Sequence, residues 1–322
     1  MILKIIREYK RILLLPVILL CFSASPLLAQ STLSIGVAPT SKILKLVPGE
    51  SYEGEVVFWN MSQNSDNYQI MVKPFRQIEN QPGTAIVLTE EEEKGYNFSA
   101  AKWITVTPQG LVKLESNKNT KLKYIINVPP DATNGEYTAE IFLISQSDAQ
   151  RKGTAAFTNL GSGMPILIQI GDEFVENAEL LTFTTEKKWY EKTSVNFYTT
   201  IKNIGDTHIT PSGEIIITNI FRQEVARIQF NRNTQSLLRE NTGNYIDNWT
   251  QSGYLSPNKA IALGPLKAKL LVTYRSIQPG FAVLTEDVTF WIIPWKIIVA
   301  ILVVALAGII YSISRKKLQN RK

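Results

Sequence analysis

The chain has 322 residues, one histidine, one cysteine and a formal net charge of +6. Its only cysteine, Cys21, lies in an N-terminal segment with the features of a removable export signal, so the mature chain has no disulfide, thiolate metal site or cysteine nucleophile. The segment 1–29 carries +3 and the residues after Ser314 carry +5, which leaves −2 for the rest. That balance excludes a basic stripe able to follow the phosphates of a nucleic acid.

The segment 1–29 has the three-part layout of an export signal. Basic residues from Lys4 to Arg11 come first, an apolar run from Ile12 to Phe22 follows, and small residues precede the expected cleavage point after Ala29. Leu20 stands before Cys21, where a lipoprotein signal requires a small residue. We therefore expect cleavage without lipidation.

The region between this signal and the C-terminus is predicted to be all-β. Short runs of apolar and β-branched residues alternate with polar ones at period two, and glycine and proline turns separate them. The predicted strands are 55–59, 68–72, 121–128, 136–144, 164–170, 195–201, 214–220 and 268–274. Residues 30–172 are expected to form a first immunoglobulin-like β-sandwich domain and residues 173–290 a second.

Residues 291–314 are predicted to be one C-terminal transmembrane α-helix with an interfacial flank. Ile297 to Ile313 is uninterrupted and apolar, and about 20 residues are needed to span a bilayer. The residues expected to anchor the helix at the two interfaces are Trp291, Trp295, Tyr311, Arg315, Lys316 and Lys317. Because cations stay inside, the tail 315–322 is expected to be cytoplasmic and the N-terminus outside, which describes a single-pass plasma-membrane protein.

Several turn motifs of the two domains occur in a recognisable order. They are Leu46-Val47-Pro48-Gly49-Glu50, Trp103 to Pro108, Val128-Pro129-Pro130-Asp131, Asn203-Ile204-Gly205-Asp206 and Pro211-Ser212-Gly213. Their order resembles the WxL-interacting surface proteins of Gram-positive bacteria. The resemblance implies a bacterial protein whose first domain binds peptidoglycan and whose second binds a host. The segment Ser236 to Arg239 departs from that pattern, because it lacks the expected proline-containing turn.

Two polar features are candidates for chemistry. His208 lies between Gly205-Asp206 and Pro211, which is typical of a turn, and we expect a solvated loop histidine rather than a catalytic base, with Asp206 closing an Asx-type turn. Glu90 to Glu93 form the densest run of charge. Adjacent carboxylates point in different directions, so an exposed loop or one helical turn is favoured over a calcium site.

Three aromatic residues, Tyr245, Trp249 and Tyr254, stand among glycine and polar residues. Such rings can stack on a sugar or anchor a protein partner. The alternative is that they cover the end of the sandwich.

No convergent set of acid, base or nucleophile is recognisable, so we expect no enzymatic activity and no cofactor. The sequence favours a membrane-anchored binding or scaffold protein at the cell surface, whose partner is peptidoglycan or another surface protein and not a nucleic acid. The alternative is an anchored assembly chaperone that acts by β-strand addition, for which Leu160 to Ile170 is the candidate edge strand.

Overall fold

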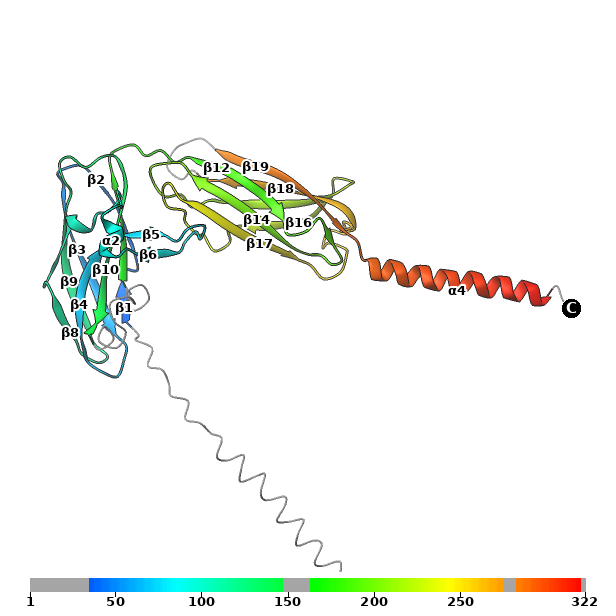
Figure 1. The fold of residues 1–322 in the computed structure, drawn as a ribbon, viewed down its shortest axis with the longest axis horizontal. Helices are drawn as coiled ribbons and strands as arrows, with labels where there is room; N and C mark the ends of the chain where they lie inside the picture. The colour runs from blue at the N-terminus through cyan, green and yellow to red at the C-terminus, as the bar shows by residue number, and fades with distance from the viewer. Residues whose placement is uncertain (1–34, 147–162, 275–281, 320–322) are drawn as a thin grey trace, which may run out of the picture.

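The computed structural model describes residues 35–146, 163–274 and 282–319, and in these it shows two β-sandwiches followed by one helix (Figure 1). The predicted all-β fold with a C-terminal apolar helix is confirmed. The first sandwich, domain 1, contains β1 to β11, and the second, domain 2, contains β12 to β19. The predicted export signal lies outside the described residues.

Domain 1 packs a four-stranded sheet against a five-stranded sheet. The smaller sheet has the order β1 (Ile35–Ala38), β3 (Ser51–Asn60), β9 (Asn119–Asn127), β7 (Ile104–Thr107). The larger sheet has the order β2 (Lys42–Leu46), β11 (Gly163–Ile170), β10 (Gly135–Ser145), β4 (Asp66–Lys73), β8 (Leu111–Leu114). β2 pairs in parallel with β11, whereas the other pairs of both sheets are antiparallel.

A small hairpin, β5 (Phe75–Gln77) with β6 (Ala85–Val87), stands apart from the two sheets of domain 1. It is followed by the single helical turn α2 (Glu90–Glu93) and by the 3-10 turn η1 (Ala101–Trp103). Figure 1 shows the hairpin extending toward domain 2.

Domain 2 is a second pair of sheets. One has the order β12 (Ala178–Thr185), β14 (Ser194–Asn203), β17 (Thr242–Thr250). The other has the order β13 (Trp189–Tyr190), β19 (Val283–Ile292), β18 (Gly264–Thr273), β15 (Ser212–Asn219), β16 (Glu224–Phe230). β13 runs parallel to β19 and the other pairs are antiparallel.

Strand β9 shows why the alternating pattern gives this fold. Leu122, Tyr124 and Ile126 point into the core of domain 1, whereas Lys121 and Lys123 face outward. Period-two alternation places every second side chain on the same face, so one face of β9 is apolar. Within the motif Trp103 to Pro108, residues Ile104–Thr107 form the edge strand β7, which ends directly before Pro108.

The predicted turn at Pro48-Gly49 leads into β3. Gly49 has φ +83°, a left-handed conformation that favours glycine, and its N–H donates to the carbonyl of Val128 at 3.2 Å. The predicted strand 164–170 forms most of β11, and both of its faces are buried from Ile168 to Ile170. In the earlier half of β11 buried and half-buried residues alternate.

Helix α4 (Trp295–Gln319) follows β19 almost directly and leaves domain 2 at the end remote from domain 1 (Figure 1). Its 21-residue stretch Trp295–Arg315 has a mean hydropathy of 2.7, and none of its most apolar window is buried. α4 is therefore long and apolar enough to cross a membrane.

Ile125 and Ile126 in β9 allow a matched test of the core, because Ile126 is fully buried and its neighbour is exposed. Ile126→Ala should lower the free energy of unfolding by about 2–5 kcal/mol, since it leaves a cavity. Ile125→Ala should change it by less than about 0.5 kcal/mol. Urea denaturation of the detergent-solubilised protein measures both, and equal costs would contradict the inward assignment of Ile126.

Candidate functional site

The junction between the two domains is built around a buried carboxylate, Glu136 at the start of β10, which is 1% exposed. Its Oε1 accepts the His208 N–H at 3.1 Å, and its Oε2 accepts the Thr207 hydroxyl at 3.1 Å and the Gln169 amide at 3.2 Å. Nδ1 of His208 also pairs with Oε2. Two of these partners belong to domain 2, so this carboxylate joins the domains.

His208 is not the solvated loop residue that the sequence led us to expect. Its side chain is only 18% exposed, because Glu136 draws it into the junction. Burial lowers the pKa of His208, but the hydrogen bond and charge of Glu136, together with the charge of Glu176, outweigh burial and raise that pKa above 6.5. The imidazole is thus held by a structural partner and does not stand free for base catalysis.

Asp206 also acts across the junction instead of closing its own turn. Its Oδ1 accepts the N–H of Val175 at 2.8 Å, and its carbonyl accepts the N–H of Glu136 at 2.9 Å. The Asx-type turn is closed by Asn203, whose Oδ1 accepts the Gly205 N–H at 2.9 Å. The predicted turn is therefore real, but a different residue closes it.

The β5–β6 hairpin forms a second set of contacts between the domains. Buried Gln77 donates to the carbonyl of Thr242 at 3.0 Å and accepts the N–H of Leu238 at 3.1 Å. Two backbone hydrogen bonds link the hairpin loop to domain 2, from Gly83 to Ser236 at 2.8 Å and from Asn244 to Asn80 at 3.0 Å. The hairpin therefore docks on domain 2 mainly through its backbone.

The segment Ser236 to Arg239, which departs from the pattern of the resembling family, supplies domain 2's side of this contact. In addition to the bonds at Ser236 and Leu238, the guanidinium of Arg239 lies over the ring of Phe98, 4.0 Å from its centroid. Its Nη1 donates to the carbonyl of Glu136 at 3.5 Å. The segment that departs from the family pattern thus forms part of the surface of domain 2 that contacts domain 1.

The candidate partner-contact residues of domain 2 do not form an exposed aromatic loop. Tyr245 and Trp249 lie on β17 and are buried in the core between the sheets, so they neither stand in an exposed loop nor merely cover the end of the sandwich. Tyr254 is half-buried and donates its hydroxyl to the carbonyl of Glu191 at 3.0 Å. Tyr245 and Trp249 are 2% and 3% exposed.

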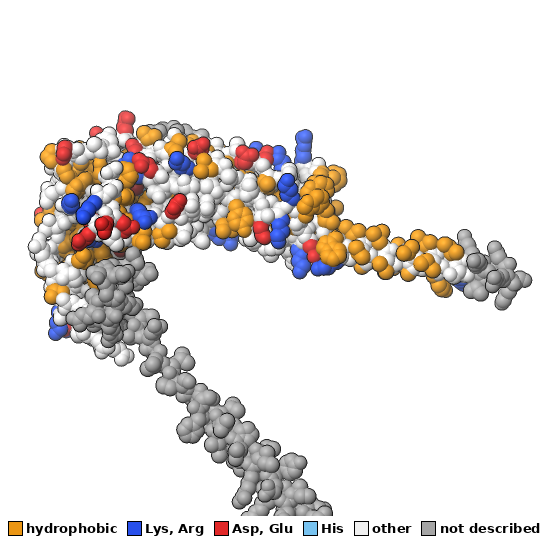
Figure 2. All heavy atoms as spheres, in the orientation of Figure 1, with side chains coloured by type: hydrophobic (Ala, Val, Ile, Leu, Met, Phe, Trp, Pro, Cys, Tyr) orange, Lys and Arg blue, Asp and Glu red, His pale blue; other side chains and the backbone are white. Residues whose placement is uncertain are grey.

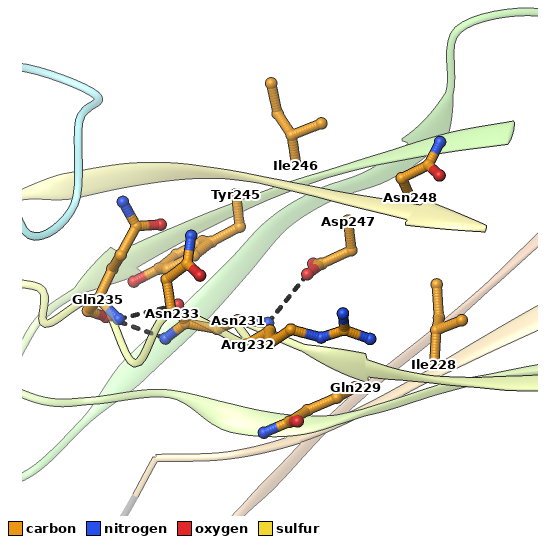
Figure 3. Close-up of a pocket in the computed structure, with 10 residues that line it drawn as sticks. All are labelled: Ile228, Gln229, Asn231, Arg232, Asn233, Gln235, Tyr245, Ile246, Asp247 and Asn248. Atoms are coloured by element: carbon orange, nitrogen blue, oxygen red, sulfur yellow. Dashed lines mark hydrogen bonds between the residues drawn. The ribbon is translucent and has the colours of Figure 1, made fainter. Parts of the chain in front are cut away.

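Tyr245 also lines a polar hollow of about 290 Å³ (Figure 3). Asp247 points into it from β17, and its Oδ1 accepts the N–H of Asn231 at 3.1 Å. Burial raises the pKa of Asp247 to about 6. Amide side chains of Asn231 and Gln235 complete a lining suited to water or small polar groups.

The acidic run Glu90 to Glu93 forms α2, one exposed helical turn, as predicted. Thr89 caps it, with a reciprocal capping box to Glu92. Glu93 pairs with Lys73 at 3.3 Å and Glu92 with Arg76 at 3.3 Å. Within residues 35–146, 163–274 and 282–319 no group of three or more His, Cys, Asp or Glu could hold a metal ion.

The predicted anchor residues lie along the path from domain 2 into α4. Trp291 is in β19, where its ring stacks on Trp189 at 5.2 Å, and Trp295 begins the helix. Tyr311 and Arg315 lie in the second half of α4, and Lys316 and Lys317 belong to its last turns. The aromatic and basic residues are thus at opposite ends of the span, except Tyr311, which lies one turn before Arg315.

The edge strand proposed for a chaperone role, Leu160 to Ile170, is only partly open in the described residues. β2 pairs with Ile166 to Ile170, so this half of β11 is interior to the sheet. Gly163 to Pro165 pair with β10 alone. The candidate edge strand of the chaperone alternative is therefore open only over a short stretch of the described residues.

No family model matches the chain and no curated protein matches it. Similar solved structures include the class 5 fimbriae chaperone CfaA, at 13% identity over 81% of this chain and 100% of that one, with a TM-score of 0.37. The Pseudomonas aeruginosa CupB2 chaperone has 12% identity over 78% and 98%, with a TM-score of 0.34. A chain of the Salmonella enterica SafA pilin complex with the SafB chaperone has 10% identity over 82% and 99%, with a TM-score of 0.36.

At such identities and scores the likeness concerns fold alone. The resemblance to WxL-interacting proteins stays a prediction.

The raised pKa of His208 predicts how stability depends on pH. His208 holds its proton more tightly in the folded chain than in the unfolded chain. The contribution of this proton to the free energy of unfolding is therefore complete below pH 6.5, and it is lost as the pH rises through the raised pKa of His208. The free energy of unfolding should fall as the pH rises from 6.5 through the raised pKa, and His208→Gln should remove most of that fall. Urea denaturation at several pH values measures it.

Titration of Asp247 does not obscure the pH range in which His208 loses its proton. Because the pKa of Asp247 is about 6, the change that Asp247 causes in the free energy of unfolding occurs at lower pH. His208 is the only histidine of the chain, so no second imidazole titrates beside it. An identical pH dependence in wild type and His208→Gln would contradict the pairing with Glu136.

Proposed function

We propose that this chain is an exported, membrane-anchored binding protein that receives a β-strand from another exported protein at the open edge of domain 1, as an assembly chaperone does. The observation that carries the proposal is the interruption in strand pairing at the edge formed by β2 and β11. A sheet edge with unpaired N–H and C=O groups can accept a further strand.

The open edge is short. Gly163 to Pro165 of β11 have β10 on one side and, among the described residues, no strand on the other. Pro165 lacks an N–H, which limits indiscriminate pairing along this stretch.

The position of the edge within the molecule also supports the proposal. α4 leaves domain 2 at the end remote from domain 1, so an anchored chain holds domain 1 away from the bilayer (Figure 1). The junction around Glu136 ties the two domains together through direct hydrogen bonds. With the N-terminus outside and the basic tail cytoplasmic, the open edge of domain 1 would lie at a fixed distance from the outer surface of the bilayer. A partner that leaves the membrane would reach the edge at that distance.

Binding of domain 1 to peptidoglycan is the second candidate, and it rests on the order of turn motifs such as Pro48-Gly49 and Val128-Pro129. Strand addition makes the more specific demand on the structure, because it requires unpaired main-chain groups at one defined place. We therefore place wall binding second. In both roles the chain binds and does not catalyse, which fits the engagement of His208 by Glu136.

A site-specific photo-crosslinker separates these functions. Placed at Pro165 in the full chain in its native cells, it should form adducts with exported proteins, and the crosslinked peptides should come from extended segments. The control position is Lys123 on β9, an exposed residue whose strand is paired on both sides, which should give few adducts. Equal yields at both positions, or retention of the chain by purified wall without adducts at Pro165, would contradict strand addition.

A further inference from the structure

The end of domain 2 that meets α4 is defined by strand register. Asn219 at the end of β15 pairs with Leu266 of β18, which in turn pairs with Phe290 near the end of β19. The turn between β15 and β16 and the loop between β17 and β18 therefore lie at the end where Trp295 begins the helix. Chain connectivity alone brings both loops near any membrane that α4 crosses.

Both loops carry exposed apolar side chains. Phe221 in the β15–β16 turn is 69% exposed and Leu255 in the β17–β18 loop is 63% exposed. The exposed apolar residues of this end, here called the membrane-facing end, are Trp189, Ile220, Phe221, Leu255, Ile261 and Leu263. Figure 2 shows hydrophobic and basic side chains gathered where the helix leaves domain 2.

Asn219 fixes these loops to each other. Its Oδ1 accepts the N–H groups of Phe221 at 3.0 Å and Gln223 at 3.1 Å, and its Nδ2 donates to the carbonyl of Ile261 at 3.3 Å. Buried Ser256 ties the other loop, where its Oγ accepts the Ala260 N–H at 3.0 Å. The exposed side chains thus stand on ordered turns that are held by buried polar residues.

The charge of this end suits an anionic surface. Four exposed cations stand beside the apolar side chains, and within the described residues of the chain none is in an ion pair: Lys188, Lys192, Arg222 and Lys259. A fifth, Lys296 on the first turn of α4, pairs with Glu191 of domain 2 at 3.0 Å. That pair links the helix directly to domain 2.

We infer that the membrane-facing end is a lipid-contact surface, which inserts Phe221 and Leu255 into the interfacial layer of the bilayer that α4 spans. The cations beside them then meet lipid phosphates, as in other interfacial anchors. The inference rests on the anchoring by α4 in the proposed function. It assigns domain 2 a second attachment to the membrane, which would fix the tilt of both exported domains.

Spin labels on the full chain in lipid nanodiscs test this inference. In a Cys21→Ser background, single cysteines replace Phe221, Leu255, Ile246 or Val304. Ile246 on β17 is the matched control, since it is 64% exposed but lies away from the membrane-facing end. Val304 in the middle of α4 reports on the anchor itself. Power saturation compares collisions with oxygen, which concentrates in lipid, and with a water-soluble nickel chelate.

Labels at Phe221 and Leu255 should favour oxygen over the chelate, and more strongly in nanodiscs with anionic lipid, whereas the label at Ile246 should favour the chelate. If Val304 reports lipid while Phe221 and Leu255 match Ile246, the inference is wrong and the anchor stands. Poor access to both reagents at Phe221 and Leu255 would indicate cover by protein and would also overturn it. A water-exposed Val304 would instead refute the anchor of the proposed function.

Discussion

The buried carboxylate of Glu136 is the constraint on which the arrangement of the two domains depends. Moving a charge out of water costs several kcal/mol unless donors compensate, and here the donors come from Gln169 in domain 1 and from Thr207 and His208 in domain 2. Separating the domains would leave this carboxylate without most of its partners. Glu136 can therefore be buried only while the two domains are in contact. This requirement ties the relative orientation of the two sandwiches to a specific set of hydrogen bonds.

Because of this junction, the two domains form a continuous arm. The β5–β6 hairpin adds hydrogen bonds from Gln77 to β17 and to the Leu238 segment, at a second place on domain 2. At one end of the arm, the edge beside Gly163 to Pro165 can accept a strand. At the other end, the short connection from β19 to α4 and the pair between Lys296 and Glu191 join domain 2 to α4. In the proposed function, these three connections hold the binding edge at a set distance from the bilayer.

The strands and the apolar helix could be predicted from sequence, because alternation and hydropathy are local properties. The junction could not, because Glu136 and His208 are 72 positions apart and neither neighbourhood signals the other. In the alternating pattern Glu136 and Thr138 occupy the polar face of β10, which suggests solvent. The structure covers that face instead, and the Thr138 hydroxyl donates to the carbonyl of Phe75 at 2.6 Å. For Tyr245 and Trp249 the sequence misleads in the opposite direction, because their polar neighbours suggest exposed rings. In β17 these polar neighbours point outward, and the two rings point into the core.

The central claim, that the domains form one rigid arm, is tested most directly by a distance distribution between spin labels on the two domains. Labels at exposed Lys113 on β8 and Glu179 on β12 are suitable in a Cys21→Ser background. Double electron–electron resonance on the full chain should give one narrow distance distribution, which broadens when Glu136→Ala and Gln77→Ala are combined with deletion of the hairpin loop 78–84, because the loop backbone also binds domain 2. A broad distribution in the otherwise unchanged chain, or a narrow one that survives the combined changes, would contradict the account.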